Sequence, residues 1–168
     1  MLILDTKEVT KRFGGLTAVN QVSMQVEEGQ VYGLIGPNGA GKSTFINSIV
    51  GRFPPTEGVV YFNGEETTGL SAEIMCHKGM ARTFQIPRPF PQLTVLENVK
   101  VGVIFGSVDK DPMPADERAR EILKFVDFNL PIDTPADRLN AVQLKSIDLA
   151  RALACKPKLL LLDELASG

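Results

Sequence analysis

The sequence predicts an α/β domain with a mostly parallel sheet, antiparallel strands near the N-terminus and an inserted helical subdomain. Strand and helix patterns alternate over residues 1–85, which is the order typical of this class. Residues 86–156 show only helical spacing, whereas residues 157–168 begin with a fully apolar run, 159–162, that suits a strand inside a parallel sheet. We therefore expect a core at 1–85, a helical subdomain at 86–156 and a strand at 157–168 that returns to the core.

Alternating side chains and turn residues predict the elements of the core. Residues 22–26 alternate apolar and polar side chains, and the Gly14-Gly15 turn separates them from a strand at 9–13. The other expected elements are strands at 31–35, 58–62 and 80–84, a helix at 43–50 and a short helix between Ser71 and Gly79.

The middle part is expected to form helices joined by loops. Thr94 caps the first helix, with Glu97 at capping-box spacing, and the helical pattern continues to about Phe105. Further helices are expected at 116–128 and 142–154. Residues 86–91 contain three prolines, so they are expected to form an irregular loop.

Bulk composition limits the possible classes of function. A chain of 168 residues with a net charge of −2 has the length of one domain and lacks the basic excess of nucleic-acid binders. Cys76 and Cys155 lie far apart and match no metal-ligand spacing, which favours a reducing compartment. The sequence shows no signal peptide and no apolar run of about 20 residues, so we expect a soluble, cytoplasmic chain.

A glycine-rich segment between an expected strand and an expected helix carries the strongest functional signal. Residues 36–43 match G-x-x-x-x-G-K-[ST], a loop whose backbone N–H groups wrap phosphate. Gly36, Gly39 and Gly41 allow backbone shapes in which a Cβ would clash, and the helix N-terminus adds partial positive charge. A chance glycine turn would not explain Lys42 and Ser43 at their offsets. The expected nucleotide-binding residues are Gly36, Asn38, Gly39, Ala40, Gly41, Lys42, Ser43 and Thr44.

Polar side chains around this loop suggest the chemistry of ATP bound with Mg²⁺. Lys42 would reach the β- and γ-phosphates, and the Ser43 hydroxyl is an oxygen ligand of the kind Mg²⁺ prefers. The apolar run 159–162 ends in Asp163-Glu164, and the ends of such strands are where open α/β sheets bind ligands. Asp163 would hold Mg²⁺ through water and Glu164 would act as general base. Taken alone, an acidic strand end is common, so this assignment depends on the phosphate loop.

These motifs, together with three others, resemble a known family. The phosphate loop is joined by Arg-Phe-Gly-Gly-Leu-Thr-Ala-Val at 12–19, Ala-Arg-Thr-Phe-Gln at 81–85 and Leu-Thr-Val-Leu-Glu-Asn-Val at 93–99. The chain resembles the ATP-binding subunits of ABC transporters and, more narrowly, the branched-chain amino-acid importer ATPases, over essentially its whole length. The resemblance implies a P-loop NTPase fold and an ATPase in which dimer closure on ATP powers transport.

The resemblance also implies roles for side chains outside the loop. Phe13 would stack on adenine, although an ordinary core phenylalanine is the alternative. Gln85 would contact Mg²⁺ and the attacking water, which places it with Lys42 and Glu164 among the catalytic residues. The alternative for Gln85 is a strand-end glutamine that only bonds backbone. The proline-rich loop, with Arg88, would contact the membrane subunit or else be solvated.

The family's signature motif, Leu-Ser-Gly-Gly-Gln, is altered in this sequence. Residues 139–143 read Leu-Asn-Ala-Val-Gln. The resemblance places Asn140, Ala141, Val142 and Gln143 at the γ-phosphate of a partner's ATP, across a dimer interface. The Asn140 amide can still donate a hydrogen bond. Val142 adds a β-branched side chain where backbone approaches phosphate, so either the local geometry differs or the contact is weakened.

Partners and completeness follow from the same resemblance. It implies transmembrane permease subunits, a second ATP-binding subunit and indirectly a substrate-binding protein, with this chain peripheral on the inner face of the cell membrane. In the family a further strand and a switch histidine follow the Asp163-Glu164 pair. The sequence ends at Gly168 and its only histidine, His77, precedes that pair. We therefore expect a truncated domain in which nucleotide binding is more robust than turnover.

Two other functions stay open at this stage. A soluble ABC-type ATPase without transport, of the repair or ribosome-associated kind, usually has long insertions or tandem domains, and this sequence has neither. A non-catalytic nucleotide-binding partner in a heterodimer would fit the altered signature, whereas Lys42, Asp163 and Glu164 favour catalysis. A transport ATPase is therefore the preferred interpretation.

Overall fold

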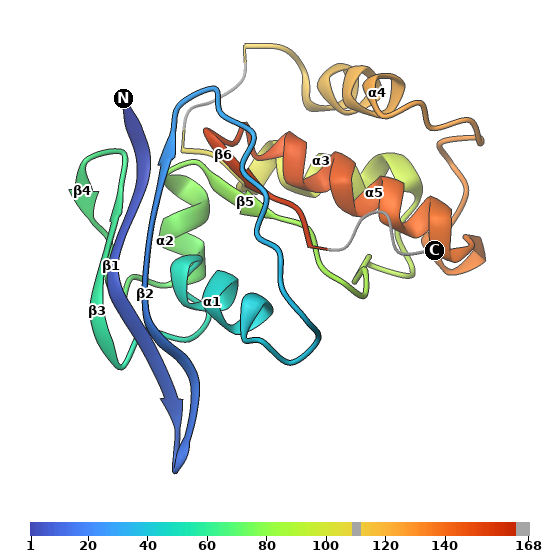
Figure 1. Cartoon of the computed structure of the whole chain (residues 1–168). Helices are drawn as coiled ribbons and strands as arrows, with labels where there is room; N and C mark the ends of the chain where they lie inside the picture. The colour runs from blue at the N-terminus through green and yellow to red at the C-terminus, as the bar shows by residue number, and fades with distance from the viewer. Residues whose placement is uncertain (109–111, 164–168) are drawn as a thin grey trace. The chain divides into compact units, whose positions relative to one another are not determined.

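The structure is a computed structural model, and it describes residues 1–108 and 112–163. The chain divides into two compact units, Met1–Met75 and Cys76–Gly168, and each is described by itself (Figure 1). The first unit contains an antiparallel sheet and the second a parallel pair of strands with helices. Both kinds of strand pairing predicted from the sequence are therefore present. The three predicted parts, 1–85, 86–156 and 157–168, stay a prediction.

The first unit is built on a four-stranded antiparallel sheet with the order β2-β1-β3-β4. Its strands are β1 (Leu2–Phe13), β2 (Leu16–Glu27), β3 (Glu57–Phe62) and β4 (Glu65–Glu66). The predicted hairpin around Gly14-Gly15 is confirmed, and its strands are longer than the alternating segments alone indicated. Asn63 and Gly64 both have positive φ, at 51° and 79°, which lets β3 turn tightly into β4.

A helix packs against this sheet and closes the core of the first unit. α1 (Lys42–Ile49) contacts β1 and β2, as Figure 1 also shows, and it buries Phe45 and Ile49. The sheet contributes apolar side chains that are almost fully buried, namely Leu4, Val9, Val60 and Phe62. α2 (Ala72–His77) follows Ser71, whose Oγ accepts a hydrogen bond from Ile74 N at 3.4 Å, as expected for an N-cap.

One predicted strand is wrong. Residues 31–35 form no strand, and Val31 and Ile35 are 99% and 94% exposed. A strand needs a neighbour to satisfy its backbone N–H and C=O groups. Within the described part of the chain, no strand pairs with this segment. The apolar pattern of residues 31–35 is therefore not sufficient to make this segment a strand.

In the described residues of the second unit, a parallel pair of strands is accompanied by α-helices. β5 (Met80–Arg82) pairs with β6 (Leu159–Leu161), and the register joins Met80 to Leu159 and Arg82 to Leu161. Both strands were predicted, at greater length, and both run toward the same edge. The parallel pairing places the residues that follow β5 and β6 at that edge.

The helices of the second unit pack against one another around an apolar core. They are α3 (Val95–Phe105), α4 (Ala115–Phe125) and α5 (Ala141–Ala154), with a 3-10 turn, Ala136–Arg138, before α5. The core contains Val95, Val99, Ala119, Leu123, Ile147, Ala150 and Ala154. The Thr94–Glu97 capping box is formed as predicted. α4 ends earlier than predicted, because Asp127 adopts a left-handed φ of 53° just beyond it.

The described residues include no helix that is long and apolar enough to cross a membrane.

Candidate functional site

The predicted phosphate-binding loop lies in the first unit, directly before α1. Gly39 and Gly41 have φ values of 81° and 86°, in the left-handed region that favours glycine. Gly41 is the N-cap of α1, and a Cβ added there would lie 2.2 Å from the carbonyl oxygen of Ala18 on β2. Gly36 differs, because a Cβ there would meet only ordinary contacts, with Ala40 Cβ at 3.6 Å. The expected glycine constraint is therefore present at Gly39 and Gly41 and not at Gly36.

The Lys42 side chain hydrogen-bonds to the backbone at the start of this loop. Its Nζ donates hydrogen bonds to the carbonyl oxygens of Gly36, at 2.6 Å, and of Pro37, at 2.8 Å. Within α1, which the structure describes in full, the first turn has neither an acidic side chain nor a side-chain cap. The N-terminus of the helix therefore keeps its partial positive charge beside the lysine ammonium. Such a combination suits an anion that accepts from backbone N–H groups and from Lys42.

Phe13 lies at the end of β1 and outside the buried core. It is 44% exposed, its ring meets that of Phe53 edge-to-face with centroids 5.7 Å apart, and Lys11 Nζ lies 5.2 Å from its centroid. The alternative of an ordinary core phenylalanine therefore does not describe this residue. The contact with adenine stays a prediction.

In the second unit, two predicted site residues, Gln85 and Asp163, follow the parallel strands β5 and β6 at the same edge. Asp163 follows β6, and its backbone N–H donates to Thr83 Oγ1 at 3.1 Å. The Asp163 carboxylate forms an ion pair with Arg82, with Nη2 and Oδ2 3.5 Å apart. Gln85 follows β5 and is exposed. Glu164, the predicted general base, lies outside the described residues.

The altered signature residues form the N-terminus of α5. Asn140 is the N-cap: its Oδ1 accepts from Gln143 N at 3.0 Å, and its N–H donates to Gln143 Oε1 at 2.9 Å. This is a capping box with asparagine in place of serine or threonine. The cap uses the acceptor half of the Asn140 amide. Ala141 and Val142 occupy the first turn, and Val142 is 71% exposed.

The comparison with known families identifies the chain. The profile of the ABC transporter family matches residues 19–167. The chain belongs to the ABC transporter family. This agrees with the phosphate loop before α1 and with the position of Asp163 at the end of a parallel strand.

Individual relatives are consistent with that assignment. The chain is 39% identical to the probable branched-chain amino acid transport ATP-binding protein LivG of Archaeoglobus fulgidus, over 100% of this chain and 69% of the relative. A solved nucleotide-free ATP-binding cassette from an ABC transporter is 36% identical, with a TM-score of 0.86 over 100% of this chain and 71% of that one. A dimeric cassette in a post-hydrolysis state bound to ADP and Pi is 30% identical, with a TM-score of 0.87 over 98% and 75%.

The family assignment confirms the main predictions from the sequence. The chain is an ABC ATPase subunit, homologous to the ATP-binding subunits of branched-chain amino-acid importers, and it has the predicted P-loop α/β fold. It spans about 70% of the length of the LivG relative.

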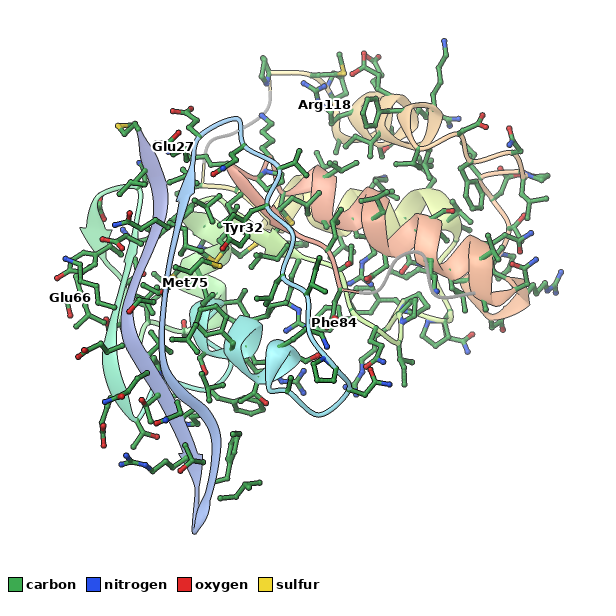
Figure 2. All side chains as sticks on the ribbon, in the orientation of Figure 1. Glu27, Tyr32, Glu66, Met75, Phe84 and Arg118 are labelled. Atoms are coloured by element: carbon green, nitrogen blue, oxygen red, sulfur yellow. The ribbon has the colours of Figure 1, made fainter. Side chains whose placement is uncertain are left out.

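Two side chains of this ABC subunit that bond the backbone near Gln85 were not predicted from the sequence. Asp148 on α5 accepts a hydrogen bond at 2.7 Å from the backbone N–H of Phe84, the residue labelled in Figure 2. Arg151 donates from Nη1 to the carbonyl oxygen of Arg88 at 2.6 Å. The Arg151 guanidinium also lies 5.0 Å from the ring centroid of Phe90. α5, which begins with the signature residues, therefore hydrogen-bonds to the chain both before and after Gln85.

The Asp148 carboxylate is unusual for its position. The residue is only 6% exposed, and burial raises the pKa of this carboxyl, against the lowering effect of the Phe84 N–H and the nearby arginines. A sequence signal existed: Asp148 falls between Ile147 and Leu149, where the helical pattern faces the core. A carboxylate at such a position needs a buried hydrogen-bond donor.

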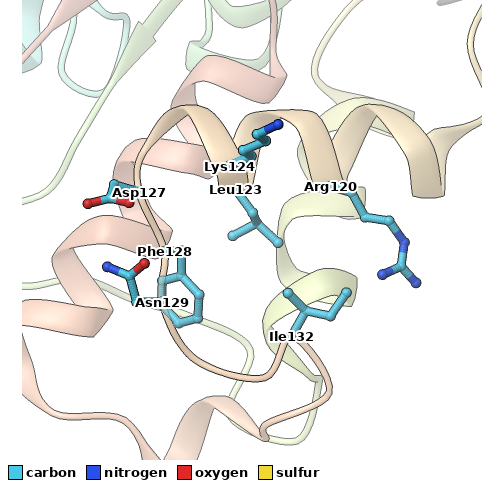
Figure 3. Close-up of a pocket in the computed structure, with 7 residues that line it drawn as sticks. All are labelled: Arg120, Leu123, Lys124, Asp127, Phe128, Asn129 and Ile132. Carbon is cyan, nitrogen blue, oxygen red and sulfur yellow. The ribbon is translucent and has the colours of Figure 1, made fainter.

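A pocket of about 300 Å³ lies elsewhere in the second unit (Figure 3). It opens beside α4 and the loop that follows, with Leu123, Phe128 and Ile132 as its apolar part and Arg120 and Lys124 as its cations. Of the predicted site residues that the structure describes, none lines it. The pocket is therefore separate from the candidate nucleotide site.

Proposed function

We propose that this chain is the ATP-hydrolysing subunit of an importer for branched-chain amino acids. The observation that carries the proposal is the phosphate loop, within a chain that aligns over its full length with a branched-chain amino acid transport ATP-binding protein. The substrate class rests on that relative. Specific contacts with the amino acid would belong to other subunits of the transporter.

The first unit would bind the nucleotide. The loop N–H groups and the N-terminus of α1 would hold the phosphates, and Lys42 would exchange its bonds to Gly36 and Pro37 for bonds to the β- and γ-phosphates. Phe13, at the exposed end of β1, would stack on adenine. The loop residues that would contact ATP are Gly36, Asn38, Gly39, Ala40, Gly41, Lys42, Ser43 and Thr44.

Oxygen-bearing side chains would hold Mg²⁺. The Ser43 hydroxyl, the Gln85 amide oxygen and the Asp163 carboxylate are the hard ligands that this ion prefers, and the last two follow neighbouring parallel strands. Bound Mg²⁺ would neutralise charge on the β- and γ-phosphate oxygens. The Arg82 ion pair holds Asp163 by one carboxylate oxygen, Oδ2. Glu164 would act as general base toward the attacking water.

The signature residues would act across a dimer. A related cassette was solved as a dimer in a post-hydrolysis state with ADP and Pi, which supports pairing of two ATP-binding subunits here. Asn140, Ala141, Val142 and Gln143 would face the γ-phosphate bound by the partner, through the exposed first turn of α5. Transmembrane permease subunits and, indirectly, a substrate-binding protein would complete the importer. The chain would then sit on the cytoplasmic face of the cell membrane.

A paired measurement tests this proposal. We expect the chain to bind a fluorescent ATP analogue with Mg²⁺ and Lys42→Ala to lose that binding, because both carbonyl contacts and the phosphate contacts of Lys42 disappear. We also expect the chain to co-purify with the membrane subunits of a branched-chain amino-acid importer, and Lys42→Ala to co-purify equally well. ATP binding without that co-purification would reject the substrate class, and unchanged ATP binding in Lys42→Ala would reject the nucleotide site.

The altered signature favours a second candidate, a non-catalytic partner in a heterodimer. Val142 stands where the family has glycine, in the turn that would approach phosphate. In this case ATP hydrolysis by the assembled transporter would survive Glu164→Gln in this chain. Loss of turnover in that variant would assign catalysis to this subunit.

A further inference from the structure

Two cysteines lie against the same glycine in the second unit. The Cys76 thiol, near the end of α2, donates to the carbonyl oxygen of Gly106 with sulfur and oxygen 3.4 Å apart. Cys155 is the C-cap of α5, and a Cβ added at Gly106 would lie 2.3 Å from its sulfur. Because Gly106 has no Cβ, the Cys155 sulfur can occupy the space next to it. Both thiols are partly exposed and neither is in a disulfide.

The two thiols also influence each other's protonation. A side-chain hydrogen bond from Cys155 is the main cause that lowers the pKa of Cys76 to about 7; burial opposes this effect, and the charge of His77 adds to it. The same bond and burial raise the pKa of Cys155, while Arg151 opposes them. Near neutral pH, Cys76 therefore exchanges between the thiol that donates to Gly106 and a thiolate, whereas Cys155 retains its proton.

A metal centre does not explain this arrangement. A structural zinc site needs four ligands, usually cysteine and histidine. Across residues 1–108 and 112–163, no cluster of three or more cysteine, histidine or acidic side chains is placed to hold an ion. The pair has the features of a dithiol: one reactive thiolate with a second thiol in contact.

We propose that Cys76 and Cys155 form a peroxide-sensitive dithiol site that closes to an intramolecular disulfide. The Cys76 thiolate attacks one oxygen of hydrogen peroxide, the O–O bond breaks, and the leaving hydroxide takes up a proton to become water. Cys76 is then a sulfenic acid. The Cys155 sulfur attacks the Cys76 sulfur, the S–S bond forms, and the hydroxyl group leaves with the thiol proton as a second water. Two thiols lose two electrons, and one peroxide is reduced to two waters.

The disulfide would connect elements on which the nucleotide site depends. Cys76 precedes β5, which leads to Gln85, and Cys155 precedes β6, which leads to Asp163. A covalent bond would draw the sulfurs to about 2 Å and restrict movement between these two chain segments. The chemistry itself needs no nucleotide, so it stands apart from the proposed transport function.

Peptide mapping tests the proposal. After the folded chain is treated with equimolar hydrogen peroxide and digested without reductant, we expect a linked peptide containing Cys76 and Cys155, which dithiothreitol separates. Its yield should fall at least severalfold when oxidation is done in urea, because the contact at Gly106 is then lost. Absence of the linked peptide, equal yield in urea, or disulfides only between chains would overturn the proposal.

Single variants assign the order of events. In Cys155→Ser we expect Cys76 to stop at sulfenic acid, which dimedone traps, because the second thiol is missing. In Cys76→Ser we expect little labelling of Cys155, whose thiol stays protonated. The opposite pattern, with dimedone on Cys155 and none on Cys76, would refute the assigned roles. Serine keeps the size of each side chain close to that of cysteine, and a circular dichroism spectrum checks that each variant is folded.

Discussion

Gly41 and Gly36 occupy the same motif and carry different physical constraints. Gly41 has a φ of 86°, and a Cβ there would lie 2.2 Å from the Ala18 carbonyl oxygen, whereas a Cβ at Gly36 would make ordinary contacts. We expect Gly41→Ala to lower the free energy of unfolding by about 1–3 kcal/mol or more, because strained backbone and a clash with β2 combine. Gly36→Ala is the matched control, with an expected loss well under 1 kcal/mol. Urea unfolding measures both, and equal losses would contradict the argument.

Asp148 links a single protonation to stability. Burial raises the pKa of its carboxyl in the folded chain above the unfolded value of about 3.9. The folded state therefore holds this proton to higher pH, so its contribution to stability falls as pH rises from the unfolded pKa through the raised one. We expect Asp148→Asn to lose less stability than the parent chain over that window, because asparagine does not titrate and its Oδ1 still accepts from Phe84 N. Urea unfolding from pH 3 to pH 8 makes the comparison.

Asp148→Ala provides the contrast for the same site. It leaves the Phe84 N–H without its acceptor, so we expect a loss of about 1–3 kcal/mol at neutral pH. If the alanine and asparagine variants were equally stable at pH 7, the hydrogen bond to Phe84 would not contribute to the folding stability.

At the scale of elements, local signals located the helices better than the strands. α3 and α5 were predicted within one residue, because each segment shows a core-facing apolar stripe and the first also follows the Thr94 cap. The strand expected at 31–35 had an equally good apolar pattern and is absent. Whether such a segment forms a strand depends on pairing with another strand, and the sequence of the segment does not specify that partner.

The start of α5 offers a test of the altered signature as a structural element. Asn140 caps the helix through its bond with Gln143 N, so we expect Asn140→Ala to cost about 1 kcal/mol of folding free energy. Asn140→Ser, which restores the family's serine, should cost only a few tenths, because serine is an equally good cap. Chemical unfolding together with hydrogen exchange over 140–146 measures both. Unchanged exchange in the alanine variant would mean that the cap contributes nothing.

At the scale of the whole molecule, the sequence predicted the chemistry of the candidate site but not the contacts that support the chain segments around it. Lys42, Ser43 and Asp163 were predicted because fixed motif spacing reflects the needs of phosphate and Mg²⁺. Asp148 and Arg151 were not, because their partners Phe84 and Arg88 are distant in sequence. Only packing of α5 against the segment after β5 brings these residues together. Contacts of this kind couple elements, so they require the three-dimensional structure.

Val142 provides a test of whether the altered signature weakens the ATP-dependent dimer. It is 71% exposed in the first turn of α5, where the proposed dimer would place the partner's γ-phosphate. A side chain that crowds this contact costs about 1–3 kcal/mol, so we expect Val142→Gly to lower the ATP-dependent dimer Kd about 10-fold. Glu164→Gln in the same chain would keep ATP intact during the measurement, which light scattering with MgATP provides.

A graded series separates crowding from flexibility in this experiment. Val142→Ala removes the β-branch and keeps full helix propensity, so its dimer Kd should fall between those of the glycine variant and the parent chain. An alanine variant equal to the parent, with glycine alone effective, would indicate that backbone freedom and not side-chain bulk limits the contact. If neither variant changes the ATP-dependent dimer while circular dichroism shows α5 intact, Val142 does not lie at the phosphate, and the dimer must close through another surface.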